Sequence, residues 1–269
     1  MWGHLMYGAI IGDIAGCVYE FSRNKRYDFQ PFLHPEGNYT DDTIMTVAIA
    51  DALLNDRPPA ESMRDWGRRV LPIENGGGYG AGFIKWLAAS EIQPPYNSYG
   101  NGSAMRVSPA GWLFDEAEDV LNAAKEVTEV SHSHPEGIKG AQAVALAIFM
   151  GRKGYERSLI KKTVIDMFGY DLERSIAEAR NTHFYNETCP GCVPDALICA
   201  LNSESFEEAV RNTISLGGDA DTLGAITGSV AEAIFGIPDN MVSEARSRLH
   251  KEFIPIVDQF YRKVCAIPL

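Results

Sequence analysis

The sequence predicts a compact, all-α fold. Apolar residues recur at intervals of three and four through most of the chain, and strand-type alternation of valine and isoleucine is scarce. Loops rich in glycine and proline separate the periodic segments. The 269 residues are 45% hydrophobic, which is enough to bury a sizeable core. We expect a single domain over residues 1–269.

The helices are expected where the apolar periodicity is strongest. Residues 41–54 carry apolar side chains on one side, and Thr40 precedes them as the expected N-cap. Four further helices are expected over residues 120–130, 140–150, 159–168 and 221–235. An apolar stripe from Ala245 to Val264 predicts one long C-terminal helix, kinked at Pro255.

Composition limits the classes of function. A formal charge of −12 argues against non-specific binding to nucleic acid or to anionic membranes, because both reward basic patches. No apolar run has membrane-spanning length, and no basic region precedes the first apolar residues, so we expect neither a membrane segment nor a signal peptide. Five cysteines, an odd number, suit a reducing compartment, and we predict a cytoplasmic protein.

Two clusters of threonine and aspartate stand far apart in the sequence, each at the start of an expected helix. The first is TDDT at residues 40–43, and the second is GGDADT at residues 217–222. Either cluster alone is most simply an acidic helix cap, because negative charge stabilises a helix N-terminus. Brought together in an all-α core, their carboxylate and hydroxyl oxygens would suit two hard divalent cations.

Residues 12–20 (GDIAGCVYE) form a third group of interest. Gly12 and Gly16 stand four residues apart and would allow another helix to pack closely. Asp13 and Glu20 stand seven apart and would share a helix face. Two interpretations stay open: both acids are exposed on an amphipathic helix, or Glu20 reaches the metal site as a water-orienting base or a further ligand.

Three further motifs have a ligand-binding and a plain structural interpretation. The loop SYGNGSAMR at residues 98–106 could cradle a diphosphate with its backbone amides, or form an ordinary turn. Residues 131–137 (SHSHPEG) could supply one imidazole to a ligand, or simply begin a helix with Pro135 in its first position. Cys189 and Cys192 lack a partner pair, so we predict neither zinc nor redox chemistry there.

Together these motifs resemble those of the ADP-ribosylglycohydrolase family. The matching segments occur in the family's order, at residues 8–20, 39–43, 77–83, 99–111, 131–141, 192–197 and 215–228. The resemblance implies a compact orthogonal helical bundle and two Mg²⁺ ions, with Mn²⁺ as an alternative. It implies metal-ligand roles for Thr40, Asp41, Asp42, Asp219, Asp221 and Thr222. It implies that the diphosphate and ribose of ADP-ribose lie against Tyr96, Asn97, Ser98, Tyr99, Gly100, Asn101, Gly102 and His132.

The predicted activity is hydrolysis of the glycosidic bond between ADP-ribose and an acceptor, either a protein side chain or a small molecule. Such bonds break through an oxocarbenium-like transition state. We expect Glu20, Asp41 and Asp219 to serve catalysis, with Glu20 or a metal-bound aspartate taking the proton of water. The alternatives are a non-catalytic, ADP-ribose-binding or crystallin-like member and a metal-dependent hydrolase of the diphosphate.

The acceptor stays open. Arginine, serine, acetate or a nucleobase would suit the same ADP-ribose half-site, so a nucleic-acid acceptor is among the candidates. The loops that would face the acceptor, residues 21–38 and 180–189, match no known acceptor-binding pattern.

Overall fold

The fold consists of helices joined by loops. The computed structural model describes residues 5–20, 22, 25–70 and 78–266, and in these residues the one strand-like contact is an isolated antiparallel bridge between Gly100 and Thr188. The elements are α1 (Tyr7–Gly16), the short 3-10 helix η1 (Cys17–Tyr19), α2 (Asp41–Leu54), α3 (Pro59–Arg69), α4 (Ala81–Ala88), α5 (Gly102–Met105), α6 (Ser108–Leu113), α7 (Ala117–Glu129), α8 (Pro135–Arg152), α9 (Arg157–Phe168), α10 (Ile176–Thr182), α11 (Cys189–Asn202), α12 (Phe206–Ile214), α13 (Ala220–Phe235), α14 (Asp239–Arg248) and α15 (Phe253–Cys265). The all-α prediction is confirmed.

The helices expected from periodicity are present, with their ends adjusted by capping. Helix α2 spans the predicted residues, and Thr40 is its N-cap because its hydroxyl oxygen accepts the Asp42 N–H (3.2 Å). Helix α8 starts earlier than expected, at Pro135, where the His134 ring accepts the Glu136 N–H (3.1 Å). A proline in the first turn gives up an N–H that has no helical partner in any case.

The single long C-terminal helix predicted from Ala245 to Val264 is wrong. The chain forms α14 and α15, and residues 249–252 separate them. The break therefore lies before Pro255 and not at it. A proline ring clashes with the carbonyl four residues earlier, so a helix that contains Pro255 can start only shortly before it.

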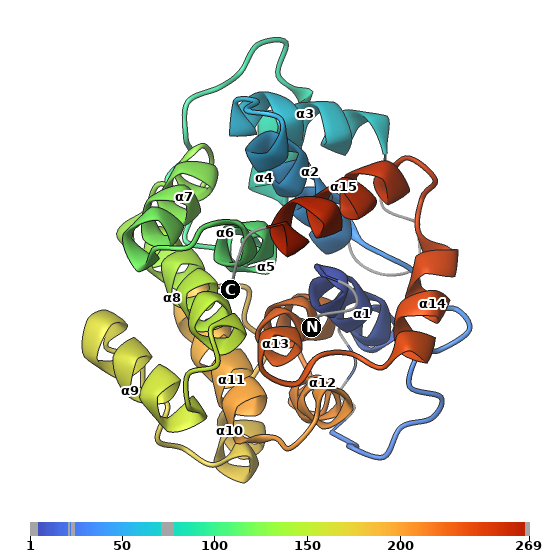
Figure 1. The fold of residues 1–269 in the computed structure, drawn as a ribbon, viewed down its shortest axis with the longest axis vertical. Helices are drawn as coiled ribbons and strands as arrows, with labels where there is room; N and C mark the ends of the chain where they lie inside the picture. Colours follow the sequence, from blue (N-terminus) through green and yellow to red (C-terminus); the bar gives the residue numbers. More distant parts are fainter. Residues whose placement is uncertain (1–4, 21, 23–24, 71–77, 267–269) are drawn as a thin grey trace.

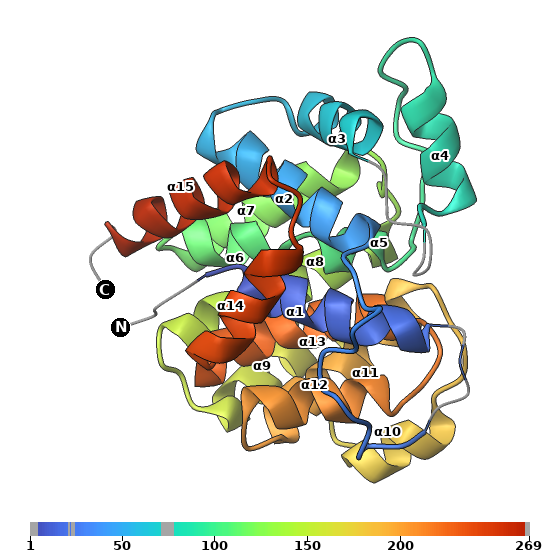
Figure 2. The same cartoon turned by 90° about the vertical axis from the view of Figure 1, so that its right-hand side faces the viewer.

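Helices α1 and α13 run side by side through the centre of the molecule (Figures 1 and 2). Helices α2, α3 and α15 lie on one side of this pair, and α10, α11 and α12 lie on the other in both views. Helix α8 packs against α13, α11, α6 and α7. The central pair is enclosed by other helices, and α1 and α13 are almost completely buried.

Glycines bring the backbones of α1 and α13 into direct contact. Along the interface Gly8 faces Gly228, Gly12 faces Gly224 and Gly16 faces Ala220. A Cβ atom added at Gly12 would lie 1.9 Å from the Gly224 carbonyl oxygen. The close packing predicted from Gly12 and Gly16 is therefore confirmed. The two helices are antiparallel, so the end of α1 lies next to the start of α13.

A buried glutamate of α13 caps the start of α1. Met6, the N-cap residue of α1, has a φ of 69° and no capping side chain. The Gly8 N–H donates instead to Glu232 Oε2 (3.0 Å). Burial raises the pKa of Glu232 to about 8, although backbone N–H groups oppose the shift. The carboxyl group is therefore protonated at neutral pH in the folded protein.

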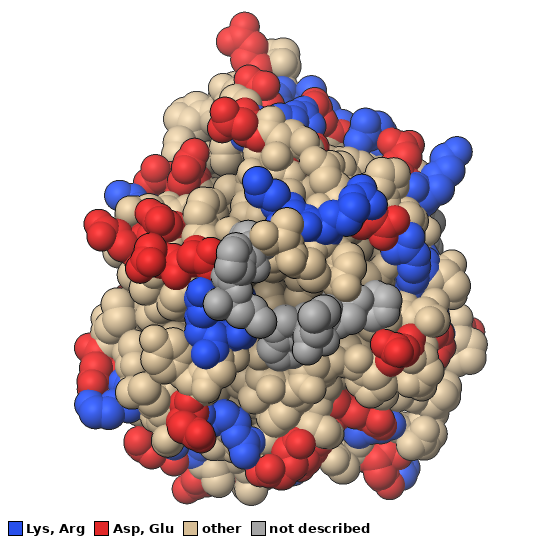
Figure 3. All heavy atoms as spheres, in the orientation of Figure 1, with Lys and Arg blue, Asp and Glu red and all other residues tan. Residues whose placement is uncertain are grey.

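The surface carries mixed charge. On the face drawn in Figure 3, acidic and basic side chains are interspersed, although the chain as a whole has a formal charge of −12. No helix among the described residues is both long and apolar enough to cross a membrane.

The contact between α1 and α13 predicts a large effect of one methyl group. We expect Gly12→Ala to lower the free energy of unfolding by about 2–3 kcal/mol, because neither backbone can move away without disturbing the core. Gly80→Ala is the matched control, since no atom lies within 4 Å of its added Cβ. Urea denaturation of both variants measures the difference. Equal stability of the two would show that the helices can separate at little cost.

Glu232 predicts a pH dependence of stability. Its pKa is about 8 in the fold, against 4.5 for a free glutamate. Because the neutral form is favoured in the fold, its contribution is complete below pH 4.5 and is lost as the pH rises through about 8. Glu232 should therefore make the free energy of unfolding of the parent fall with rising pH by at most about 1.4 kcal/mol per pH unit, and Glu232→Gln should abolish this fall. Urea unfolding from pH 5 to 9 tests this, with the exposed Glu118→Gln as control. Parallel profiles for parent and Glu232→Gln would contradict it.

Candidate functional site

A cavity of about 360 Å³ opens where the start of α2, the start of α13 and the residue after η1 come together. The part of its lining that bears carboxylates consists of Glu20, Asp41, Asp42, Asp219, Asp221 and Glu187. Arg106, Phe83, Tyr96 and His132 line other parts of the same cavity. The two threonine/aspartate clusters, 180 residues apart in sequence, therefore meet in space, and Thr222 Oγ1 donates to Asp42 Oδ2 (3.3 Å).

Asp13 of α1 holds the first turn of α2 in place. Its Oδ2 atom accepts the Thr40 N–H (3.0 Å) and the Thr43 N–H (3.1 Å), and also the Thr43 hydroxyl. The side chain is fully buried. The interpretation of residues 12–20 as a helix with two exposed acids is therefore wrong for Asp13. Its carboxylate connects α1 to α2 from behind the cavity, where no sequence pattern pointed to it.

The start of α13 depends on a glycine turn. Gly217 and Gly218 have φ values of 75° and 79°, a region that glycine adopts without steric cost. The turn presents Asp219, whose Oδ2 accepts a hydrogen bond from Asn101 Nδ2 (2.6 Å). Asp221 lies in the first turn of α13, where its Oδ1 accepts the Thr222 N–H (2.9 Å).

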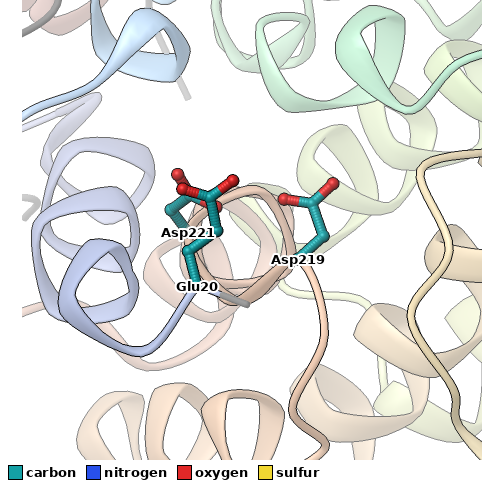
Figure 4. A group of neighbouring side chains, drawn as sticks. All are labelled: Glu20, Asp219 and Asp221. Carbon is teal, nitrogen blue, oxygen red and sulfur yellow. The ribbon is translucent and has the colours of Figure 1, made fainter. Parts of the chain in front are cut away.

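Glu20 follows η1, because α1 ends at Gly16. Asp13 and Glu20 thus do not share one continuous helix face, as the spacing of seven had suggested. Glu20 nevertheless meets the second cluster: ligand atoms of Glu20, Asp219 and Asp221 lie within 4.8 Å of one another, a group that could hold a metal ion. Figure 4 shows the three carboxylates pointing to the same side of the α13 N-terminus.

The acids repel one another in the absence of a counter-ion. Burial, followed by neighbouring carboxylates, raises the pKa of Glu20 to about 8 and that of Asp41 to about 7. The same causes raise the pKa values of Asp42 and Asp221 well above the usual range. Buried oxygens of Glu20 (Oε2) and Asp42 (Oδ1) have no hydrogen-bond partner among the described atoms. An all-oxygen donor set of this kind fits hard divalent cations.

Arg106 is a buried cation that lines the same cavity. Its Nη2 donates to Ser131 Oγ (2.8 Å), and its Nε has no partner among the described atoms. Burial lowers the pKa of Arg106 to about 10, which leaves it charged at neutral pH. His132 lies beside it, and burial together with Arg106 lowers the pKa of this imidazole well below its usual value. His132 is therefore a neutral ring.

The loop before α5 is anchored to the segment before α11. The Asn101 N–H donates to the Glu187 carbonyl (2.8 Å), and the Cys189 N–H donates to the Tyr99 carbonyl (2.9 Å). The Asn101 side chain is supported by Cys192, whose Sγ accepts from Asn101 Nδ2 (3.4 Å). The backbone amide of Asn101 is thus already used, so the loop offers fewer free amides to an anion than its sequence suggested.

Most of the residues predicted for the site line the cavity. Of the predicted metal ligands, Asp41, Asp42, Asp219, Asp221 and Thr222 do so, together with Glu20. Of the predicted ligand-binding residues, Tyr96, Ser98, Gly100, Asn101, Gly102 and His132 do so. Thr40, Asn97 and Tyr99 are not among the described lining residues. The side chains of Phe83, Met105, Arg106, Tyr185 and Glu187, for which no individual role was predicted, also line it.

The chain is similar to known proteins over almost its whole length. The model of the ADP-ribosylglycohydrolase family matches residues 4–266. The ADP-ribosyl-[dinitrogen reductase] glycohydrolase of Rhodospirillum rubrum is 25% identical, with 93% of this chain and 92% of that protein covered. ADP-ribosylhydrolase ARH3 of Mus musculus is also 25% identical, over 86% of this chain and 82% of its own length.

Two further proteins, one compared by sequence and one by structure, are similar over most of the chain. ADP-ribosylarginine hydrolase Tri1 of Pseudomonas putida is 25% identical, over 86% of this chain and 70% of that protein. A solved structure described as an ADP-ribosylglycohydrolase-related protein complex superposes with a TM-score of 0.66, covers 96% of both chains and is 23% identical. At that identity the structural likeness supports the fold.

The acidic cluster predicts that divalent cations stabilise the protein. We expect Mg²⁺ or Mn²⁺ to raise the thermal midpoint of EDTA-treated protein, by about 2.7 kcal/mol of stability at a hundred times the dissociation constant. Asp221→Asn should lose most of this gain and, in EDTA, should melt above the parent because one repelling carboxylate is gone. Differential scanning fluorimetry measures both effects, with Asp166→Asn as an exposed control. The same cation shift in parent and Asp221→Asn would argue against this site.

Proposed function

Because the chain belongs to the ADP-ribosylglycohydrolase family, we propose that it hydrolyses the glycosidic bond between ADP-ribose and an acceptor and releases ADP-ribose. The observation that carries the proposal is that two kinds of side chain line one cavity. The carboxylates of Asp41, Asp42, Asp219 and Asp221 line it, and so do Arg106 and neutral, partly aromatic side chains. A ribose and a diphosphate would each find suitable partners in such a cavity.

The diphosphate of ADP-ribose would lie towards Arg106 and His132. Arg106 forms no salt bridge with any described carboxylate, so its charge is available to an anion. His132 Nδ1 lies 2.8 Å from Ser131 Oγ, and a Cβ added at Gly102 would lie 3.4 Å from His132 Nε2. The ring thus borders the glycine loop, where Gly100 and Gly102 leave room for a ligand.

The ribose would lie against the carboxylates, with two Mg²⁺ ions, or Mn²⁺ in their place. We assign the ligand roles to the two clusters, which comprise Thr40, Asp41, Asp42, Asp219, Asp221 and Thr222. When bound, the ions would neutralise the carboxylates and polarise oxygens of the substrate. Thr40 would contribute mainly by holding Asp42, since its hydroxyl donates to Asp42 Oδ2 (3.3 Å).

In the proposed reaction, water attacks the anomeric carbon as the bond to the acceptor breaks through an oxocarbenium-like transition state, and the proton that the water gives up ends on the departing acceptor atom. With the ions bound, the Glu20 carboxylate would be ionised and would accept the proton of that water, because its Oε2 has no partner among the described atoms and its side chain lines the cavity. Asp41 and Asp219 hold the ribose in place and stabilise positive charge as it develops. Asn101 fixes the orientation of Asp219 through the hydrogen bond to its Oδ2.

Conservative substitutions of the three acids test the proposal. We expect Glu20→Gln, Asp41→Asn and Asp219→Asn each to lower the rate of ADP-ribose release by about 10²–10⁴-fold, as removal of a positioned acid or base does. The assay incubates each protein with Mg²⁺ and ADP-ribosylated peptides, and chromatography identifies the products. The exposed Asp166→Asn variant should keep the parent rate.

The product also separates the alternative activities. Release of AMP in place of ADP-ribose would identify a diphosphate hydrolase. ADP-ribose binding without any turnover would identify a binding protein. Either result would refute the proposed hydrolysis of the glycosidic bond.

A further inference from the structure

A second cavity, of about 380 Å³, lies beside the first. Its described lining includes Lys25, His183, Phe184, Tyr185 and Gly218. It is formed by the loops that the sequence could not match to any acceptor, together with the glycine turn before α13. Nothing in the proposed binding of ADP-ribose uses this space.

Three separate chain segments lead from the first cavity into the second. Tyr185 lines both cavities. Glu20 lines the first, and Ser22, two residues later, lines the second. Asp219 lines the first, and Gly218, directly before it, lines the second. The second cavity therefore adjoins the part of the first that Glu20 and Asp219 line, where the anomeric carbon would be.

A buried pair of side chains supports this cavity. His183 Nδ1 lies 2.7 Å from Asp195 Oδ2, and Arg174 Nη2 donates to Asp195 Oδ1 (2.7 Å). Both His183 and Asp195 are more than nine-tenths buried. His183 Nε2 has no hydrogen-bond partner among the described atoms, and a Cβ at Gly218 would lie only 3.1 Å from it. The imidazole thus supports the turn that presents Asp219.

Lys25 gives the cavity a positive charge. Its ammonium group donates to the backbone carbonyls of Arg180 (3.1 Å), His183 (3.3 Å) and Leu216. These carbonyls hold the side chain in place but carry no net charge. Within the described part of the chain, no carboxylate forms a salt bridge with Lys25. A cationic group that entered this cavity would meet an ammonium that forms no salt bridge with a described carboxylate, although the buried Asp195 acts on it from a distance.

Two aromatic side chains stand at the edge of the cavity. Phe184 is 72% exposed and Tyr185 is 44% exposed, both high values for large apolar groups. An exposed phenyl ring next to a charged pocket suits the chain segment that flanks a modified side chain.

We propose that this second cavity is the acceptor subsite, and that Lys25 makes it select an uncharged acceptor joined through oxygen over a guanidinium. The proposal rests on the proposed function, because it assumes that ADP-ribose occupies the first cavity. Lys25 acts by charge repulsion against a cationic acceptor. Phe184 contacts the flanking segment of a protein acceptor, and Asp195 and His183 are positioning residues for Lys25 and Gly218.

The experiment compares two peptides of the same sequence, one ADP-ribosylated on serine and one on arginine, together with the acetate ester of ADP-ribose. We expect the parent to cleave the serine peptide at least tenfold more efficiently than the arginine peptide. In Lys25→Met the ratio of serine-peptide to arginine-peptide cleavage should fall about tenfold, because the arginine peptide is cleaved more efficiently. Lys25→Arg keeps the charge and should preserve the ratio. Phe184→Ala should lower kcat/KM for the serine peptide and leave the acetate ester unchanged.

Affinity for free ADP-ribose separates the two cavities. Neither Lys25→Met nor Phe184→Ala should change its dissociation constant more than twofold, and Lys162→Met, an exposed lysine elsewhere, should match the parent throughout. An unchanged ratio of serine to arginine cleavage in Lys25→Met, or a loss of ADP-ribose affinity, would overturn the subsite.

Failure of the proposed function would look different. If the parent released ADP-ribose from none of the three compounds, the hydrolysis would be refuted. The binding affinities of the serine-linked and the arginine-linked peptide would then be measured for the parent and for Lys25→Met. If Lys25→Met changed both affinities by the same factor, the subsite would be refuted as well.

Discussion

The backbone contact between α1 and α13 is the constraint on which the rest of the structure depends. Two antiparallel helices can approach this closely only where Gly8, Gly12 and Gly16 present no side chain to the partner. The contact places Glu20, just after α1, beside Asp219 and Asp221 at the start of α13. Asp13 on the same helix binds the first turn of α2. One helix therefore sets the relative positions of all three acidic segments.

This geometry concentrates negative charge that the protein itself does not balance. Asp13 is stabilised by backbone N–H groups and a hydroxyl, and its pKa still rises to about 6 because it is completely buried. In the cavity, burial and neighbouring carboxylates raise the pKa of Glu20 to about 8 and the pKa values of Asp42 and Asp221 well above the usual range. Buried like charges are tolerated where cations or protons neutralise them. The buried carboxylates lower the stability of the fold, and the cations that the site is proposed to bind would offset this destabilisation.

The two cavities differ in the charge that surrounds them. The first combines carboxylates with the buried guanidinium of Arg106, which together suit a ligand that carries hydroxyls and a diphosphate. The second carries the ammonium of Lys25 and two exposed aromatic rings. Gly217 and Gly218 form the boundary between them, because the same turn presents Asp219 to one cavity and its own backbone to the other. A substrate that spans both would place its scissile bond at this turn.

The sequence by itself determined the features that depend on neighbours three or four residues away. These are the extents of α2 and α13, the Thr40 cap, the close-packing glycines and the two acidic helix starts. The break before Pro255 also follows from a local rule, although the apolar stripe concealed it. Only the tertiary structure decided the hydrogen-bond partners of Asp13, Arg106, His183 and Lys25. Their partners lie 27, 25, 12 and 191 residues away, and no local periodicity specifies which distant backbone or side chain a buried polar group will meet.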